Sequence, residues 1–203
     1  TYSTDAFLWS LPNSQGDGPH LMADACDYAR FCSAIDFWVM TDHAEASTPR
    51  KWGETIKAVQ NCNKVNQDKN IKDLFSFVGF EWTQISENKE DHYGHKNVIF
   101  LETDNNLLPG VPFGAAGYSS DNFRNNANLS ISRRNMLGAA VVDFSNRQRY
   151  ADFLSFFEEV LAHPDCDMKD PDPRNCYRSY RTPKDLFEVL NTVKSDSIVI
   201  PHG

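Results

Sequence analysis

The stretch "IDFWVMTDHAE", residues 35–45, places an apolar segment directly before an acid, an imidazole and a second acid. Its first half is aromatic and β-branched, which is typical of a strand buried in a sheet. Two further runs have the same form: "LFSFVGFEW", residues 74–82, reaches Glu81, and "SIVIPH", residues 197–202, ends on His202. Each of these three predicted strands therefore reaches a side chain that can bind a metal or transfer a proton.

Segments with helical spacing separate the predicted strands. Four helices are predicted, at residues 21–33, 50–62, 147–162 and 182–193. Thr48 with Pro49, and Thr182 with Pro183, supply the cap and first-turn proline that begin a helix. Alternating strands and helices favour an α/β fold with a parallel sheet or barrel. Residues 102–146 have little periodicity and many Asn, Gly and Ser residues, which predicts a long irregular insertion.

The composition is that of one globular domain and excludes several functions. The chain has 203 residues, of which 40% are hydrophobic and 24% are charged. Its formal net charge is −8 and its cations are not clustered, which argues against non-specific binding of nucleic acid. No run of about 18 apolar residues is present, so we expect no membrane span.

The five cysteines leave the redox compartment open. Cys166 and Cys176 bracket a loop rich in Pro and Asp, and a disulfide there would stabilise the fold by roughly 2 to 3 kcal/mol. Such a bond favours a periplasmic or secreted location, whereas two unrelated thiols would carry no such information. Cys26, Cys32 and Cys62 lie in predicted helices, where we expect small apolar core residues.

The ends of the predicted strands form a candidate metal site. In parallel α/β folds the loops that follow neighbouring strands converge at the carboxyl ends of those strands, so His43, Glu81 and His202 are expected to face one spot. Imidazoles and carboxylates are ligands of zinc, manganese and iron. Asp42 could orient His43 or simply be solvated, and Glu45 is interpreted as a charge at the approach to a helix.

Two more histidines, His92 and His95, precede a fourth predicted strand at residues 98–101. His95 adds to the candidate ligands. His92 could be a ligand, a proton donor to a leaving group or a surface residue. His163 is expected at the end of a helix, where exposed carbonyls favour a cation, and this predicts a structural role.

Five motifs together resemble the DUF3604 family, which is related to the PHP (polymerase and histidinol phosphatase) metal-dependent phosphoesterases. They are "TYSTDAF", "IDFWVMTDHAE", "FVGFEWT", "DHYGHKNVIF" and "IVIPHG", and they span nearly the whole chain. The resemblance implies a distorted (βα)7 TIM-type barrel of parallel strands that binds two or three divalent ions, zinc, manganese or iron. The family's His-x-His motif would precede Thr1 and its Asp-x-His motif would follow Gly203, so residues 1–203 are expected to form a single, incomplete PHP-like domain.

The resemblance also assigns roles to individual residues. It implies that the metal ligands are Asp5, His43, Glu81, His95 and His202, with Glu81 bridging two ions. The implied function is that of a metal-dependent hydrolase, most simply a phosphoesterase acting on a small molecule, in which the ions activate water and Glu81 and His92 take part in catalysis. Two alternatives stay open, because fold does not determine function: an inactive binding module, and a hydrolase of the amidohydrolase type that cleaves a C–N bond.

Overall fold

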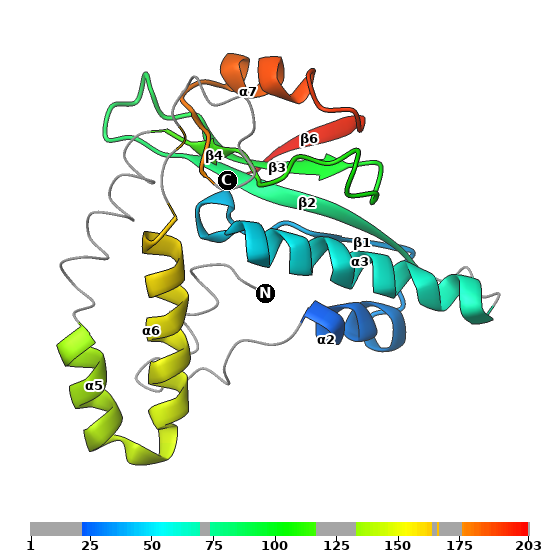
Figure 1. Ribbon diagram of the computed structural model, residues 1–203. Helices are drawn as coiled ribbons and strands as arrows, with labels where there is room; N and C mark the ends of the chain where they lie inside the picture. The colour runs from blue at the N-terminus through cyan, green and yellow to red at the C-terminus, as the bar shows by residue number, and fades with distance from the viewer. Residues whose placement is uncertain (1–21, 70–73, 117–132, 164–165, 167–175, 203) are drawn as a thin grey trace.

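The computed structural model describes residues 22–69, 74–116, 133–163, 166 and 176–202. A four-stranded sheet has the order β1-β2-β3-β6, and a smaller sheet pairs β4 with β5 (Figure 1). The strands are β1 (Phe37–Met40), β2 (Phe75–Gln84), β3 (Gly94–Phe100), β4 (Gly114–Ala115), β5 (Ser179–Tyr180) and β6 (Ser197–His202). The α-helices are α2 (Met22–Asp27), α3 (Pro49–Lys69), α5 (Arg133–Val142), α6 (Arg147–Leu161) and α7 (Pro183–Leu190).

Three strands of the larger sheet point the same way and β3 points the opposite way. Strand β1 is parallel to β2, whereas β3 is antiparallel to both β2 and β6. The expectation of parallel strands is therefore wrong for β3, because the connection through residues 85–93 is too short for the crossover that parallel neighbours need. The described strands form an open sheet. Because β3 runs the opposite way, its first residues lie beside the last residues of β2 and β6, at one end of the strands.

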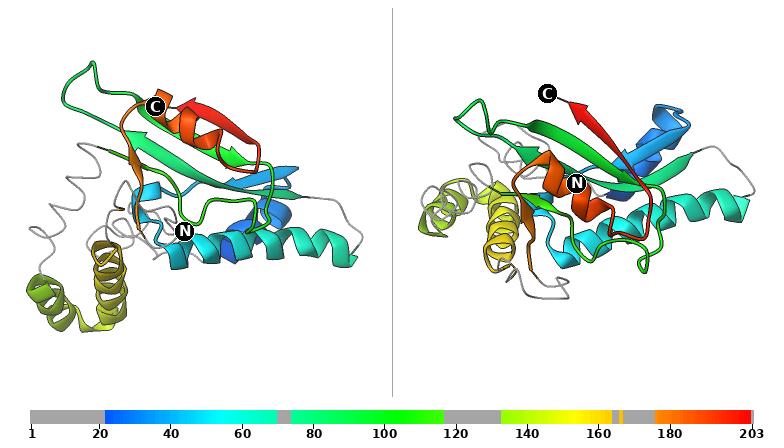
Figure 2. Two further views of the ribbon diagram at one scale, coloured as in Figure 1. Left: turned by 45° about the horizontal axis from the view of Figure 1, so that its top comes forward. Right: turned by 90° about the horizontal axis from the view of Figure 1, so that it is seen from above.

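One face of the larger sheet is covered by helices α3 and α7 (Figure 2). Alternate side chains of β2, Val78, Phe80 and Trp82, point into a core that also holds Trp52 of α3 and Leu186 of α7. All five side chains are at most 2% exposed. Burying an apolar side chain of this size contributes about 1.5 to 3 kcal/mol, so this face holds the sheet in place.

The opposite face of the larger sheet is apolar over most of its area and largely exposed. Phe37, Phe75 and Ile198 are 67%, 52% and 64% exposed. A cavity of about 290 Å³ lies on this side and includes Val39 and Ile99 in its lining. Because successive residues of a strand alternate between faces, this face also carries the polar side chains at the ends of β2 and β6 and the start of β3.

The predicted helix starts are confirmed by their caps. The amide of Lys51 donates to the Thr48 hydroxyl at 3.3 Å, and α3 begins at Pro49. At α7 the Thr182 hydroxyl accepts from the Asp185 amide while the Asp185 carboxylate accepts from the Thr182 amide, a complete capping box. In the described part of the chain, no helix is both long and apolar enough to cross a membrane.

The predicted irregular insertion at residues 102–146 is wrong in its last part, which forms α5. Met136, Ala139 and Ala140 of this helix pack against Tyr150 and Phe153 of α6. The apolar spacing of α5 is weak by itself, and the neighbouring helix supplies the apolar surface that stabilises it. Residues 117–132 of the predicted insertion lie outside the described residues.

Two disulfides are present in the described residues. Cys166 and Cys176 are joined, as one of the two readings of the sequence predicts. Cys26 of α2 is joined to Cys62 of α3. Both are buried core residues, as predicted, but they form a disulfide that the sequence did not indicate. Cys32 is an exposed free thiol rather than a core residue.

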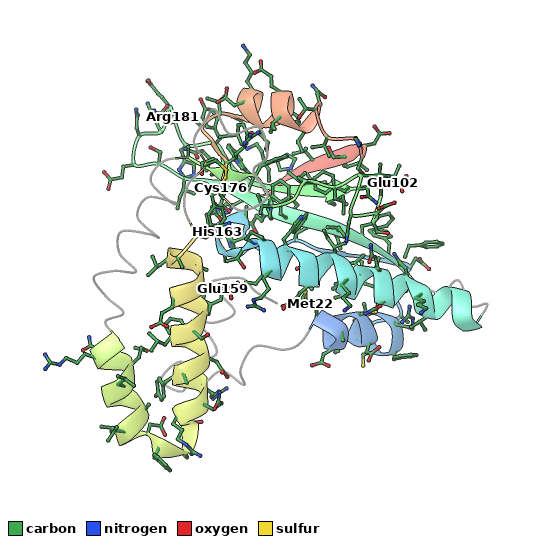
Figure 3. All side chains as sticks on the ribbon, in the orientation of Figure 1. Met22, Glu102, Glu159, His163, Cys176 and Arg181 are labelled. Atoms are coloured by element: carbon green, nitrogen blue, oxygen red, sulfur yellow. A yellow bond between two sulfur atoms is a disulfide. The ribbon has the colours of Figure 1, made fainter. Side chains whose placement is uncertain are left out.

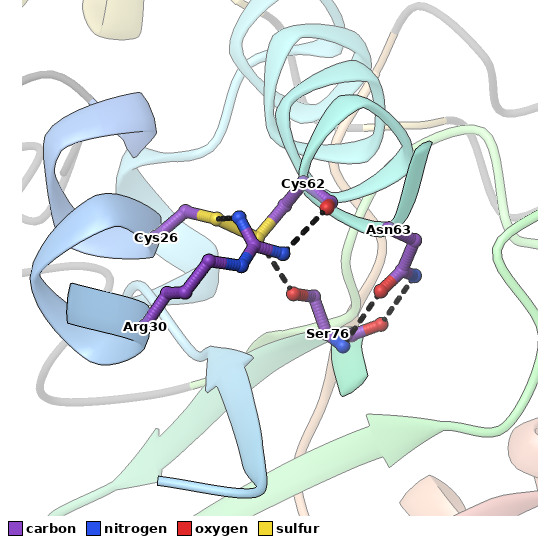
Figure 4. Close-up of a disulfide and its surroundings, with 5 residues drawn as sticks. All are labelled: Cys26, Arg30, Cys62, Asn63 and Ser76. Carbon is purple, nitrogen blue, oxygen red and sulfur yellow. Dashed lines mark hydrogen bonds between the residues drawn. A yellow bond between two sulfur atoms is a disulfide. The ribbon is translucent and has the colours of Figure 1, made fainter. Parts of the chain in front are cut away.

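The bond between α2 and α3 is enclosed by polar partners (Figure 4). Arg30, which is 7% exposed, donates to the Cys62 carbonyl at 3.0 Å, and the Ser76 hydroxyl lies 2.9 Å from Cys62 Sγ. Asn63 pairs with the backbone of Ser76 through both its amide nitrogen and its amide oxygen. These contacts fix α2 and α3 to the start of β2.

Gly79 of β2 lies where a larger side chain has no room. A Cβ atom added there would lie 2.5 Å from the Val98 carbonyl oxygen and 3.1 Å from methyl carbons of Thr41 and Val39. At Gly53, in the exposed part of α3, an added Cβ would meet nothing within 4 Å.

Substitution of these two glycines should have opposite effects. We expect Gly79→Ala to lower the free energy of unfolding by about 1 to 3 kcal/mol, because a fixed backbone oxygen must shift. The control Gly53→Ala should raise it by about 0.5 to 1 kcal/mol through helix propensity. Urea unfolding of both variants measures this, and a Gly79→Ala protein as stable as the wild type would contradict the packing described.

Lys51 is a buried cation between α3 and α6. It is 1% exposed, and its Nζ lies 3.9 Å from the centre of the Phe156 ring and 3.8 Å from Glu159 Oε2. Glu159, on α6 (Figure 3), also pairs with Thr48 and Arg50. Burial lowers the pKa of Lys51 to about 8, because the interior disfavours the charged form.

The low pKa of Lys51 makes stability depend on pH. The unfolded chain binds this proton up to a pH near 10.5, whereas the folded chain releases it near 8, so the free energy of unfolding should rise between these values by about 2 to 3 kcal/mol. We expect the Lys51→Met protein to have a higher free energy of unfolding than the wild type at pH 7, and to lack the rise in that free energy at higher pH. Urea unfolding from pH 7 to 10 tests both, with the exposed Lys57→Met as control; an unchanged rise in Lys51→Met would contradict the assignment.

Candidate functional site

The register of the sheet places five polar side chains close together at the carboxyl ends of β2 and β6. Thr83 of β2 pairs with His95 of β3, and His95 pairs with His202 of β6. His43 forms an isolated parallel bridge with Glu81, two residues before Thr83. Directly opposed residues share a face of a sheet, so all five side chains lie on the face away from the helices.

Glu81 lies at the centre of three histidines. His95 Nδ1 is 2.7 Å from Glu81 Oε1, which is a hydrogen bond. His202 Nε2 is 3.8 Å from Oε1 and His43 Nε2 is 3.9 Å from Oε2. The rings of His95 and His202 are stacked, with centroids 5.5 Å apart. The structure therefore brings together four of the residues singled out from the sequence.

Solvent reaches this cluster from the open face of the sheet. The Glu81 side chain is 14% exposed, whereas the exposed fractions of the His43, His95 and His202 side chains are 22%, 33% and 43%. The Glu81 carboxylate is thus largely shielded from solvent, and the three imidazoles around it are accessible. A small ligand can approach the histidines without displacing core side chains.

Thr83 joins the cluster, although the sequence alone did not single it out. Its hydroxyl donates to Glu81 Oε1 at 2.9 Å and lies 3.1 Å from both His43 Nδ1 and His95 Nδ1. The available signal was its position two residues after Glu81 in one strand, which places both side chains on the same face.

Glu45 lies beside the cluster, in the first turn of the 3-10 helix Ala44–Ala46 that precedes α3, which agrees with its interpretation as a charge at the approach to a helix. It is 8% exposed, and its Oε2 lies 3.8 Å from His43 Nδ1. Burial raises the pKa of Glu45 to about 7, and His43 opposes this rise. The Tyr177 hydroxyl donates to the Glu45 carbonyl at 2.8 Å, which fixes the short 3-10 turn after His43.

The donor types fit a divalent metal, but the present side-chain arrangement is closed by hydrogen bonds. The separations of 3.8 and 3.9 Å from Glu81 to His202 and His43 exceed a hydrogen bond and fall below about 4.2 Å, twice a zinc–ligand distance. However, among the described residues no group of three or more His, Cys, Asp or Glu side chains is arranged to hold an ion. Binding an ion would therefore require rotation of these side chains.

Two buried oxygens beside the cluster support such a rearrangement. Glu45 Oε1 and Asn97 Oδ1 have no hydrogen-bond partner among the described residues. Asn97 is opposite Glu81 in the register of β2 and β3 and lies on the same face. A buried oxygen without a partner costs about 1 to 3 kcal/mol, so both are suited to bind a cation or a donor.

The other candidates are not at Glu81. Asp5 lies outside the described residues. His92 is exposed in the loop between β2 and β3, and its Nδ1 contacts the backbone nitrogen and oxygen of Ser86 at 3.3 and 3.1 Å. His163, at the end of α6 (Figure 3), packs edge-on against Tyr177 with ring centroids 4.9 Å apart, as a structural residue would.

The functional argument rests on the side-chain geometry at Glu81, because comparison with known proteins supplies no evidence of function. The chain matches no protein-family model, no curated protein and no solved structure. The metal-binding role of the histidines accordingly stays a prediction from donor chemistry and placement.

Proposed function

We propose that this chain is a metal-dependent hydrolase domain that acts on a small phosphoester. The observation that carries the proposal is the Glu81 carboxylate with His43, His95 and His202 around it at one edge of the sheet. The proposal includes divalent zinc, manganese or iron and the PHP-like distorted barrel that the sequence motifs resemble, in which the open sheet would form one part.

Three side chains are suited to hold an ion. His43 Nε2 and His202 Nε2 flank the two oxygens of Glu81 at distances that an ion can bridge. A bound divalent ion supplies charge that activates water and stabilises the oxygens of a phosphoester. This local charge matters because the chain carries a formal net charge of −8, which disfavours the approach of an anion.

His95 and Thr83 hold the carboxylate. The bonds from His95 Nδ1 and the Thr83 hydroxyl both reach Glu81 Oε1, which leaves Oε2 toward His43. Fixed hydrogen bonds of this kind orient a ligand carboxylate and raise the cost of displacing it.

A catalytically inactive binding module is the second candidate, and one observation favours it. The cluster is already closed by hydrogen bonds, with no ion-ready group of three among the described residues. Such a module would be folded and metal-free. The two candidates therefore differ in a property that can be measured directly.

Metal content separates the two candidates. Protein stripped of metal, loaded with Zn²⁺ or Mn²⁺ and freed of excess ion should retain at least about one equivalent by elemental mass spectrometry, because rotation of Glu81, His43 and His202 would bring three donors to one ion. We expect Glu81→Ala and His43→Ala to reduce this retention by about tenfold or more. The exposed His92→Ala is the matched control and should retain metal as the wild type does.

Circular dichroism of each variant checks that it is folded. Folded wild-type protein that retains no metal would overturn the hydrolase proposal and favour the binding module. If metal is retained, hydrolysis of p-nitrophenyl phosphate and of p-nitroacetanilide by the loaded protein distinguishes a phosphoesterase from an enzyme that cleaves C–N bonds.

We further propose a periplasmic or secreted location, supported by the Cys26–Cys62 and Cys166–Cys176 bonds. Alkylation of the denatured protein without reductant should modify Cys32 alone, and all five cysteines should react after reduction. Mass spectrometry counts the adducts. Three or five adducts before reduction would contradict the pairing.

A further inference from the structure

Helices α5 and α6 lie side by side in a hairpin that projects away from the larger sheet (Figure 1). One face of α6 is buried, and its residues Phe153, Phe156 and Val160 are at most 3% exposed. A second set of α6 residues, spaced by four, three and four positions, lies on another face of the helix and lines a groove beside α5. This set, here called the groove stripe, consists of Arg147, Ala151, Leu154 and Glu158.

The groove is apolar in its middle and open to solvent. It has a volume of about 150 Å³, and Leu137 and Ala140 of α5 line its other side. Leu137 is 57% exposed, and Val141, one turn further along α5, is 77% exposed. A cavity of this volume can hold a group of the size of benzene, so an apolar side chain of another chain fits into it. Apolar surface gathered in this way is typical of a site that binds another protein.

The two charged residues of the groove stripe lie at opposite ends of α6. Arg147 is the first residue of the helix and Glu158 lies in its last turn, so about 16 Å of helix separates them. A helix dipole favours an acid in the first turn and a base in the last turn, which is the reverse of this arrangement. Each charge is therefore placed unfavourably on its own helix. Beside a second α6 that runs in the opposite direction, each charge would lie next to a helix end of the favourable sign.

We propose that a second copy of this chain docks on the groove, with the two α6 helices antiparallel, so that the two hairpins form a four-helix bundle. A two-fold axis at the midpoint of the groove stripe places Arg147 opposite Glu158 of the second copy, and Ala151 opposite Leu154 of the second copy, because both pairs have the same midpoint in the sequence. Opposite charges then meet at both ends, and a large apolar residue meets a small one on each side of the axis. Antiparallel helices with an apolar seam of this spacing are the usual arrangement in four-helix bundles.

The occupant is a second copy because the groove stripe is complementary to itself. Its charge changes sign about its midpoint, so one surface supplies both the cation and the acid of each ion pair. The Arg147 guanidinium lies 4.3 Å from the centre of the Phe144 ring and donates to the Phe144 carbonyl at 3.0 Å, and Glu158 also interacts within its own chain. Arg has more N–H donors than these contacts use and a carboxylate accepts several hydrogen bonds, so both groups can bind the second copy as well.

Sedimentation equilibrium of the full chain tests the proposal, from about 1 to about 300 μM, which covers the dissociation constants of weak complexes. Every form carries Cys32→Ser, so that this exposed thiol cannot link two copies covalently. The variants are Arg147→Glu, Glu158→Arg, the double variant with both changes, and Ala151→Glu. Lys184→Glu is the control for a charge reversal, because this side chain of α7 is 83% exposed and lies outside the hairpin. Circular dichroism at the lowest concentration checks that each form is folded.

We expect the Cys32→Ser parent to pass from monomer to dimer within this range. Either single reversal, at Arg147 or at Glu158, places like charges opposite each other at both ends of the stripe and should raise the dissociation constant about tenfold or more. The double variant restores opposite charges and should return the dissociation constant to within about threefold of the parent value. Ala151→Glu should stay monomeric because it places a charge in the apolar middle of the groove, whereas Lys184→Glu should dimerise as the parent does.

A folded parent chain that stays monomeric up to about 300 μM would overturn the proposal. A dimer that persists unchanged in Ala151→Glu would also overturn it, and would place the contact on another surface, such as the exposed apolar face of the larger sheet. If both single reversals weaken the dimer and the double variant does not restore it, the antiparallel pairing of Arg147 with Glu158 is wrong and the proposal fails.

Discussion

The alignment of β3 between β2 and β6 is the constraint on which the site depends. An antiparallel neighbour begins where the strands beside it end, so one reversed strand is enough to place Thr83, His95 and His202 in a row. A shift of β3 by one residue against β2 would turn the imidazole of His95 toward the helices. The packed face protects this register, because the same shift would move Val98 and Phe100 out of the core.

The polar cluster and the apolar core therefore occupy opposite faces of the same strands. Hydrogen bonds among Glu81, Thr83 and the histidines satisfy groups that would be costly to leave partly buried and without partners. The same bonds compete with any ion for the carboxylate. When such a cluster binds an ion, internal hydrogen bonds are replaced by metal–ligand bonds. Its affinity for the ion therefore depends on the small difference in free energy between two favourable states.

Sequence patterns predicted the four strands of the larger sheet, the helix caps and the polar strand ends, because each rests on local chemistry. They could not give the direction of β3, since hydrophobic periodicity carries no polarity of the chain. Cys26 and Cys62 occupy positions where a buried thiol and a half-cystine look the same in sequence. Thr83 was missed because its contacts are with residues on other strands, and a single sequence contains no such distances.

The pairing of β4 with β5 affects which segment of the chain can change in length during evolution. Ala115 and Tyr180 are adjacent in the smaller sheet, so the segment with α5 and α6 leaves and returns at neighbouring points. A segment whose two ends are held close together can lengthen or shorten at a small entropic cost, because the entropic cost of closing a loop grows only with the logarithm of its length. Changes of length in this segment are thus separated from the strands that hold the histidines, and new surfaces can evolve there without realigning the sheet.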